Sequence, residues 1–294
     1  MMSDNLKNAT APTDDEGKVY HLRLGKGDVP QFMILPGAPE RTTIIAKNWD
    51  DIREVASYRE YKTVTGRYKN IPVGTTSTGI GAASSEIAIH ELSVLGVHTC
   101  IRVGTTGAIQ PEYELGDLVI NSAAVRHDGT SDNYIEPAYP AAADPIVTMA
   151  LMQACENLGY RYGVGIGYTA ASFYIGQGRS LAEDQSETSE KKKDVYEPSF
   201  MANLIPDLTA AGVINIEMEA SGQFVVGRLH GMRMGAILAV LANRATNKWG
   251  EKGGEEKASK AASEAVYLLK EWEVKGEVSL KLSKRLRIES ASYY

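Results

Sequence analysis

An α/β fold with a mainly parallel central sheet is predicted for this chain of 294 residues. Two observations lead to it. Short apolar segments alternate with longer segments whose apolar residues recur at helical spacing, and residues 234–242 are almost wholly apolar, as in a strand covered on both faces of its sheet. Such alternation is typical of parallel strands joined by helices. The length allows one large domain or two ordinary ones.

The first half of the chain contains two predicted helices, each placed after a strand. Proline in the first turn, Pro39, is a usual helix start, and the apolar periodicity continues to about Trp49. Ala88, Leu92 and Leu95 lie at helical spacing and share one face of the second helix. Strands are expected at residues 31–37, 72–79, 100–111 and 117–125.

The second half continues the same alternation. Asp144 directly before Pro145 predicts a capped helix whose apolar face extends to Leu158. Residues 213–219 alternate in polarity and end in carboxylates, which places acidic side chains at the end of a strand. Further strands are expected at residues 162–171 and 234–242, and helices at 224–229 and 256–272.

Three segments depart from the alternating pattern. Residues 1–18 are polar and acidic and are expected to form a disordered extension. Residues 183–198 are dense in charge and poor in apolar side chains, which indicates a surface insertion. Residues 277–294 fit either an edge strand or a flexible basic end. The folded domain is therefore expected to span residues 19–276.

Composition narrows the class of partner. Lys and Arg number 31 against 37 Asp and Glu, and this net charge of −6 argues against nucleic acid and acidic membranes as general partners. No apolar run is long enough to span a bilayer, and residues 1–18 contain no apolar signal-peptide core. Two cysteines, Cys100 and Cys155, cannot form a disulfide framework. We expect a cytoplasmic protein.

Residues 100–111 combine a strand with a glycine-rich loop. Arg102 lies within the apolar part, and the segment then becomes Gly-Thr-Thr-Gly at 104–107. Glycines expose backbone N–H groups, so this stretch predicts an anion site at the carboxyl end of a strand. The alternative is a tight turn with an arginine paired to a core carboxylate. Arg41, beside a helix start that follows Gly37, gives a second candidate anion site.

Eight short motifs in one order resemble the uridine phosphorylases of the nucleoside phosphorylase-I family. Together they extend over roughly residues 19–272. The motifs are His21-Leu22, Leu35-Pro-Gly-Ala-Pro-Glu-Arg41, Ser57-Tyr-Arg-Glu60, Ser77-Thr-Gly-Ile-Gly81, Ile101-Arg-Val-Gly-Thr-Thr-Gly-Ala-Ile-Gln-Pro111, Phe173-Tyr-Ile-Gly-Gln-Gly-Arg179, Glu217-Met-Glu219 and Asn243-Arg244.

The resemblance implies a single domain with a mixed, mainly parallel central sheet flanked by helices, and an enzyme that converts uridine and phosphate into uracil and ribose 1-phosphate. No cofactor is then required, because inorganic phosphate is the co-substrate. Each substrate group has its implied residues. Phosphate is assigned to Gly37, Arg41, Arg59, Arg102, Gly104 and Thr105, ribose to His21, Thr105, Glu217, Met218 and Glu219, and the base to Thr106, Gly107, Phe173, Gln177, Arg179 and Arg244.

The resemblance also implies a homo-oligomer, a dimer or a hexamer built from dimers, whose active sites are shared. Arg59 and His21 would come from a neighbouring subunit. Glu60, Ile80 and Ser84 match the positions that hold a potassium ion between subunits in bacterial members.

Alternatives remain. One departure from the family pattern is Ala38, where an aspartate is usual; it leaves open a catalytically silent nucleoside-binding protein. A purine nucleoside phosphorylase or a nucleosidase of the same superfamily would want an aspartate where this chain has Asn243. A dinucleotide oxidoreductase is disfavoured because no strand ends in the GxGxxG pattern.

Overall fold

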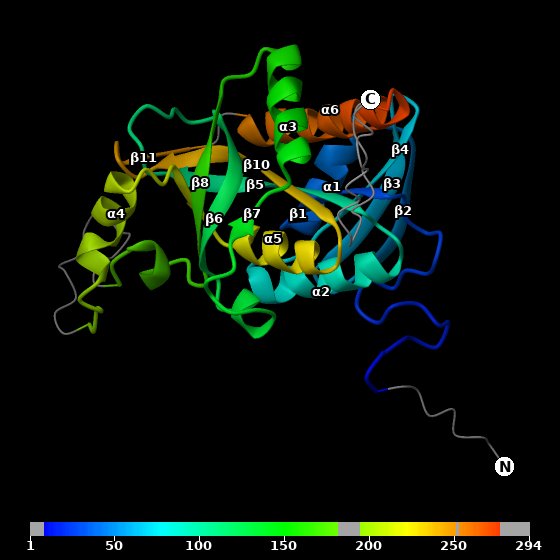
Figure 1. Cartoon of the computed structure of the whole chain (residues 1–294), viewed down its shortest axis with the longest axis horizontal. Helices are drawn as coiled ribbons and strands as arrows, with labels where there is room; N and C mark the ends of the chain where they lie inside the picture. Colours follow the sequence, from blue (N-terminus) through cyan, green and yellow to red (C-terminus); the bar gives the residue numbers. More distant parts are fainter. Residues whose placement is uncertain (1–8, 182–194, 251–252, 277–294) are drawn as a thin grey trace, which may run out of the picture.

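The computed structural model describes residues 9–181, 195–250 and 253–276. The described strands join in one mixed sheet with helices on both faces (Figure 1). The strands are β1 (Phe32–Pro36), β2 (Asp50–Tyr58), β3 (Tyr61–Tyr68), β4 (Ile71–Thr76), β5 (Thr99–Ala108), β6 (Leu118–His127), β7 (Ala141–Ala142), β8 (Tyr162–Ala170), β9 (Asn215–Glu217), β10 (Arg233–Asn243) and β11 (Lys248–Trp249). The helices are α1 (Pro39–Ala46), α2 (Ala82–Val94), α3 (Pro145–Leu158), α4 (Met201–Ala210), α5 (Ala220–Leu229) and α6 (Gly254–Val274), with 3₁₀ turns at Ser131–Asn133 and Ile175–Gln177.

The centre of the sheet is parallel. β1 lies between β4 and β5, and β5 also pairs with β10, all in parallel register. The sheet then closes on itself, because β10 pairs with β6, β6 with β8, β8 with β9, and β9 with β5. The predicted α/β class and mixed sheet are confirmed. Antiparallel pairings occur where β10 meets β6, where β9 meets β5, and along the β2–β3–β4 edge.

Two layers of helices cover this sheet. β1 shows why its residues are continuously apolar: Phe32 and Ile34 pack into one core, whereas Met33 and Leu35 pack into the other. Helices α1, α3 and α6 contribute to the first core, and α2 and α5 to the second (Figure 1). No helix in the described part of the chain combines the length and the apolarity that crossing a membrane requires.

Several elements were not predicted. β2 is the exposed edge of the sheet, and its run of charged residues around Arg53 hides the alternation that identifies a strand. α4 contains Pro206, which is unusual inside a helix, yet its apolar side chains pack against Tyr168 and Ile216. Both elements are stabilised by tertiary contacts, and their local sequence patterns are not those typical of a strand or a helix.

The predicted extensions are only partly described. Residues 9–18, expected to be disordered, instead form a turn in which the Asp14 carboxylate accepts hydrogen bonds from the backbone N–H groups of Glu16 and Lys18. Composition did not reveal this turn because one side chain closes it. Residues 1–8, most of the predicted insertion 183–198, and the predicted tail 277–294 lie outside the described residues.

Candidate active site

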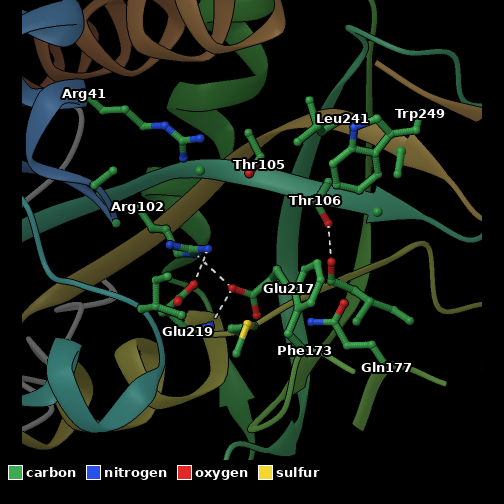
Figure 2. A pocket seen from close by; sticks show the side chains of 18 of the residues that line it. Arg41, Arg102, Thr105, Thr106, Phe173, Gln177, Glu217, Glu219, Leu241 and Trp249 are labelled. Atoms are coloured by element: carbon green, nitrogen blue, oxygen red, sulfur yellow. Dashed lines mark hydrogen bonds and ion pairs between the residues drawn. The ribbon is translucent and has the colours of Figure 1, made fainter. Parts of the chain in front are cut away.

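A cavity of about 260 Å³ lies at the carboxyl ends of the parallel strands β1, β5 and β10, and β9, which runs antiparallel to β5, ends beside it. This is the edge at which an anion site was predicted. Figure 2 shows Arg41 and Arg102 together at one end, here called the arginine end, and Phe173 with Gln177 at the other, here called the aromatic end. Of the predicted site residues, the cavity is lined by Gly37, Arg41, Ile80, Arg102, Gly104, Thr105, Thr106, Gly107, Phe173, Gln177, Arg179, Glu217, Met218 and Glu219.

Arg102 is fixed by two carboxylates. Its Nε donates to Glu217 at 3.0 Å, and its Nη2 lies 2.5 Å from Glu219 (Figure 2). Gly104 makes room for the guanidinium, since a Cβ there would lie 2.9 Å from Arg102 Nη2. The alternative considered for Arg102, a pair with a buried carboxylate, is therefore present, and it lies within the cavity itself.

Glu217 also organises the start of α5. Its carboxylate accepts hydrogen bonds from the backbone N–H groups of Glu219 and Ala220 and from the Thr169 hydroxyl. These contacts end β9 at Glu217 and begin the helix at Ala220, so the strand is shorter than the predicted 213–219. One buried side chain thus caps a helix and holds Arg102 in the cavity.

Glu219 follows at the junction of β9 and α5. Its carboxylate accepts a hydrogen bond of 2.6 Å from the backbone N–H of Gly81, which precedes α2. Burial raises the pKa of Glu219 above its ordinary value; Arg102 opposes this shift and Glu217 adds to it. The cavity therefore contains a carboxylate whose charge is costly in the absence of a further partner.

Arg41 has a different partner. It comes from the first turns of α1, and its Nη2 donates to Glu255 at the start of α6, at 2.5 Å. The Arg41 side chain is 24% exposed, whereas that of Arg102 is 4% exposed. The two arginines of the arginine end are thus held by carboxylates of different elements, Arg41 by α6 and Arg102 by the junction of β9 and α5.

The aromatic end is built around Arg179. Its guanidinium lies over the Phe173 ring, 3.9 Å from the centroid, and donates to the Phe173 carbonyl and, at 2.5 Å, to Gln177 Oε1. Burial lowers the pKa of Arg179 to about 10, so it stays charged at neutral pH. The Gln177 amide is consequently oriented by a cation, and its oxygen retains a second lone pair for another donor.

Arg244, also predicted at the base site, does not line the cavity. It donates to the backbone carbonyls of Gln177 and Gly178 from behind the loop. Burial lowers its pKa. Arg244 supports the residues that do line the aromatic end.

Two further residues predicted to bind substrate, His21 and Arg59, lie outside the cavity of their own chain. The ring nitrogen Nδ1 of His21 lies 2.8 Å from the buried carboxylate of Glu91, which also accepts from the His21 backbone N–H. Arg59 occupies the turn between β2 and β3 with φ 54°, a conformation that is uncommon for a residue with a side chain. Its guanidinium lies beside the Tyr58 ring.

The residues predicted to hold a cation gather beside the cavity. The Ser84 hydroxyl lies 2.9 Å from Glu60 Oε1 and 2.6 Å from the Thr78 carbonyl. A backbone hydrogen bond, assisted by Ser84, lowers the pKa of Glu60, so this carboxylate is charged. Ile80 lies in the same loop and is 78% exposed. Carboxylate, hydroxyl and carbonyl oxygens are the donor types that suit a hard cation.

Other residues of the site were not predicted. Trp249 on β11 and Leu241 on β10 line the cavity, and Figure 2 shows them together, close to Thr105 and Thr106. Glu255 contacts Arg41 without lining the cavity. The sequence signal for Trp249 is weak: it is a tryptophan that closely follows the Asn243-Arg244 motif.

Comparisons with known proteins agree with this geometry. The model of the phosphorylase superfamily matches residues 31–271. The uridine phosphorylase of Thermococcus kodakarensis is 48% identical over 276 residues, covering 94% of this chain and 95% of that protein. That of Treponema pallidum is 35% identical over 254 residues, covering 85% and 93%. A guanosine phosphorylase of Halorubrum lacusprofundi is 36% identical over 245 residues, covering 83% and 92%.

Proposed function

The chain belongs to the phosphorylase superfamily, and from this membership we propose that it cleaves uridine with phosphate, giving uracil and ribose 1-phosphate. The observation that carries the proposal is the single cavity that joins an arginine end to an aromatic end, with two carboxylates between them. Phosphate, ribose and base need these three environments in this order.

At the arginine end, phosphate would be held by Arg41, Arg102 and Thr105, with backbone N–H groups at Gly37 and Gly104. Charge-assisted hydrogen bonds from several fixed donors suit a phosphate oxyanion. Arg102 is already oriented by Glu217, so it loses little freedom on binding. The phosphate is thereby placed next to the ribose carbon that it attacks.

Between the two ends, Glu219 and Met218 would contact the ribose. Breaking the glycosidic bond develops positive charge on the sugar. Glu219 is buried and lines the cavity beside Arg102, where its negative charge would stabilise that state more than the neutral substrate. Glu217 lines the cavity too, but its oxygens are occupied by Arg102, Thr169 and backbone N–H groups. Its proposed contribution to ribose binding is therefore indirect, because its carboxylate holds the backbone N–H of Glu219.

At the aromatic end, the leaving base becomes an anion. Gln177 can match a carbonyl and an N–H of uracil together, Arg179 adds a cationic donor, and Phe173 offers a ring for stacking. Thr106 and Gly107 line the same cavity and are the further proposed contacts of the base. Donors that take up the developing charge remove the need for a general acid on the base.

Shared active sites form part of the proposal. His21 and Arg59 lie outside their own cavity, and Glu91 and Tyr58 hold them, which supports a role in the site of a neighbouring subunit. The assembly would be a dimer or a hexamer built from dimers. A potassium ion would be held between subunits by Glu60, Ile80 and Ser84, where it would order the loops beside the cavity. Two free, buried cysteines support a cytoplasmic location.

Guanosine phosphorolysis is the second candidate, because the superfamily relative from Halorubrum lacusprofundi is a guanosine phosphorylase. The contacts of Asn243 weigh against it. Its amide donates to the carbonyls of Gln110 and Tyr113, and its oxygen accepts from the Thr246 backbone N–H. It is therefore occupied by the protein and offers no acid for a purine nitrogen.

Release of free base from uridine, inosine, guanosine and adenosine, each with and without phosphate, tests the proposal. We expect phosphate-dependent cleavage of uridine and roughly 10³-fold lower kcat/KM for inosine, because the amide and guanidinium of the aromatic end would be left unpaired by a purine. Guanosine cleaved as fast as uridine would favour the second candidate. Uridine cleaved equally well without phosphate would indicate a hydrolase.

A further inference from the structure

We propose that Glu255 is a positioning residue for phosphate: from the far side of Arg41, it holds the guanidinium in the orientation in which phosphate meets it. This inference rests on the proposed function, since it takes Arg41 to be a phosphate ligand. Glu255 belongs to α6, which contributes no residue to the lining of the active-site cavity in the described part of the chain.

The location of Glu255 shows from which side it acts. Arg41 lines the active-site cavity, whereas Glu255 lines a neighbouring cavity of about 240 Å³. Thr105 and Leu241 line both cavities and form the partition between them. Glu255 therefore reaches Arg41 from behind. Its bond to Nη2 leaves Nε and Nη1 of the guanidinium to other partners.

Arg41 needs such a partner more than Arg102 does. Arg102 is locked by two buried carboxylates, but Arg41 extends from a helix of 8 residues and is partly exposed. An arginine side chain has many rotamers, and fixing one of them costs conformational entropy at the moment of binding. A contact that fixes the rotamer beforehand transfers this cost from binding to folding. The loop residue Ala38, directly before α1, carries no charge that could do the same.

The position of Glu255 is itself fixed by packing. A Cβ at Gly254 would lie 2.8 Å from the Ala239 Cβ and 3.2 Å from the Gly116 Cα, so only glycine lets α6 begin this close to β10. Further along α6, Ser263 accepts a hydrogen bond of 3.0 Å from Trp49 Nε1, just after α1. This hydrogen bond and the Arg41–Glu255 pair both join the region of α1 to α6.

Glu256 provides a matched control. It occupies the same first turn of α6, so removing either carboxylate costs the same favourable interaction with the helix N-terminus. Glu256 pairs instead with Lys47 at 3.4 Å, and both side chains are about two-thirds exposed (68% and 67%). Any difference between the two substitutions then reports the contact with Arg41.

The experiment compares Glu255→Ala, Glu255→Gln, Glu256→Ala and Arg41→Ala in the full chain. Measurements are steady-state kinetics with phosphate varied at saturating uridine, calorimetric titration with phosphate alone, and melting temperature. We expect Glu255→Ala to raise the phosphate KM and Kd about tenfold, with kcat and the uridine KM within about twofold. Glu255→Gln should recover most of the affinity, since an amide oxygen still accepts from Nη2. Glu256→Ala should behave as the unmodified protein.

Three results would overturn the inference. A phosphate KM that falls in Glu255→Ala would mean that the carboxylate competes with phosphate for Arg41, and an unchanged KM would mean that the pair is passive. Equal losses in Glu255→Gln and Glu255→Ala would contradict positioning through a hydrogen bond. Arg41→Ala separates this inference from its premise. If Arg41→Ala binds phosphate normally, the placement of phosphate in the proposed function is wrong. If Arg41→Ala binds phosphate poorly while Glu255→Ala binds it normally, only the role of Glu255 fails.

Discussion

Two buried arginines, Arg233 and Arg102, differ in the ion pairs that they form. Arg233, at the start of β10, pairs with Asp144 at 2.6 Å, and both side chains are less than a tenth exposed. Arg102, in the middle of β5, is buried equally well but contacts both Glu217 and Glu219. Among the ion pairs of the described residues, Arg102 thus bridges two carboxylates (the Arg102 cluster), whereas the Arg233 pair is formed with Asp144 (the Arg233 cluster).

The two clusters differ in the further contacts that their carboxylates make, apart from the ion pairs with arginine. Asp144 accepts hydrogen bonds from the backbone N–H groups of Ile146 and Val147 and so caps α3. Glu217 likewise caps α5, but Glu219 adds a second negative charge that burial makes costly, which raises its pKa. The Arg233–Asp144 pair lies outside the lining of the active-site cavity and fixes the start of α3. The Arg102 cluster sets two carboxylates against one guanidinium, and it lies in the cavity where the ligands are proposed to bind.

The largest effect that separates the two clusters should be on catalysis. We expect Arg102→Ala to lower kcat/KM for uridine phosphorolysis by about 10³-fold or more, because it removes a donor from the arginine end and leaves two carboxylates facing the phosphate. Arg233→Ala, measured per folded molecule, should keep nearly full activity. The measurement is initial rate of uracil formation, corrected for the folded fraction by circular dichroism. Comparable losses of activity in Arg102→Ala and Arg233→Ala would contradict the proposed difference between the two clusters.

The next largest effect should be on stability, and here the loss is expected from a substitution in the Arg233 cluster. Asp144→Ala removes a helix cap and leaves Arg233 without this buried partner, at a cost of about 3–5 kcal/mol. We expect the melting temperature to fall by about 5–10 °C, while the phosphate and uridine KM values of the remaining folded protein stay unchanged. Asp144→Asn should lose less, since its oxygen can still cap α3. A melting temperature within a degree of the unmodified protein would show that the pair is dispensable.

The smallest effect should be a pH-dependent change in stability at Glu219. Because its folded-state pKa is raised, the native protein binds a proton at pH values where the unfolded chain has released it, so this group stabilises the fold as pH falls toward that pKa. Glu219→Gln mimics the protonated form. It should therefore be at least as stable as the unmodified protein at pH 8, with the gain shrinking as pH falls.

Thermal melting between pH 8 and pH 5 measures this effect, with Glu264→Gln as a control. That buried carboxylate accepts hydrogen bonds from Tyr68 and Lys69 and does not line the cavity. Glu219→Gln should at the same time lose most of its activity. Lower stability of Glu219→Gln across the whole pH range would contradict the idea that the Arg102 cluster is strained by excess charge.

The sequence by itself determined the features that depend on neighbouring residues. Asp144 before a proline predicted the capped start of α3, and the Gly-Thr-Thr-Gly segment after Arg102 predicted the edge of the sheet at which the cavity lies. The eight family motifs identified most of the residues that line it. Helical and strand periodicity are local properties, so they can be detected in a single segment of the chain.

Tertiary structure alone decided which side chains meet. Arg102 contacts Glu217 across 115 positions, and Arg41 contacts Glu255 across 214, and neither pairing has a local pattern. The charged edge strand β2 and the rim residue Trp249 likewise acquire their places only from strand order and sheet closure. The reason is physical: residues distant in sequence come into contact only once the order of the strands and the packing of the helices are fixed, and no local periodicity encodes that order.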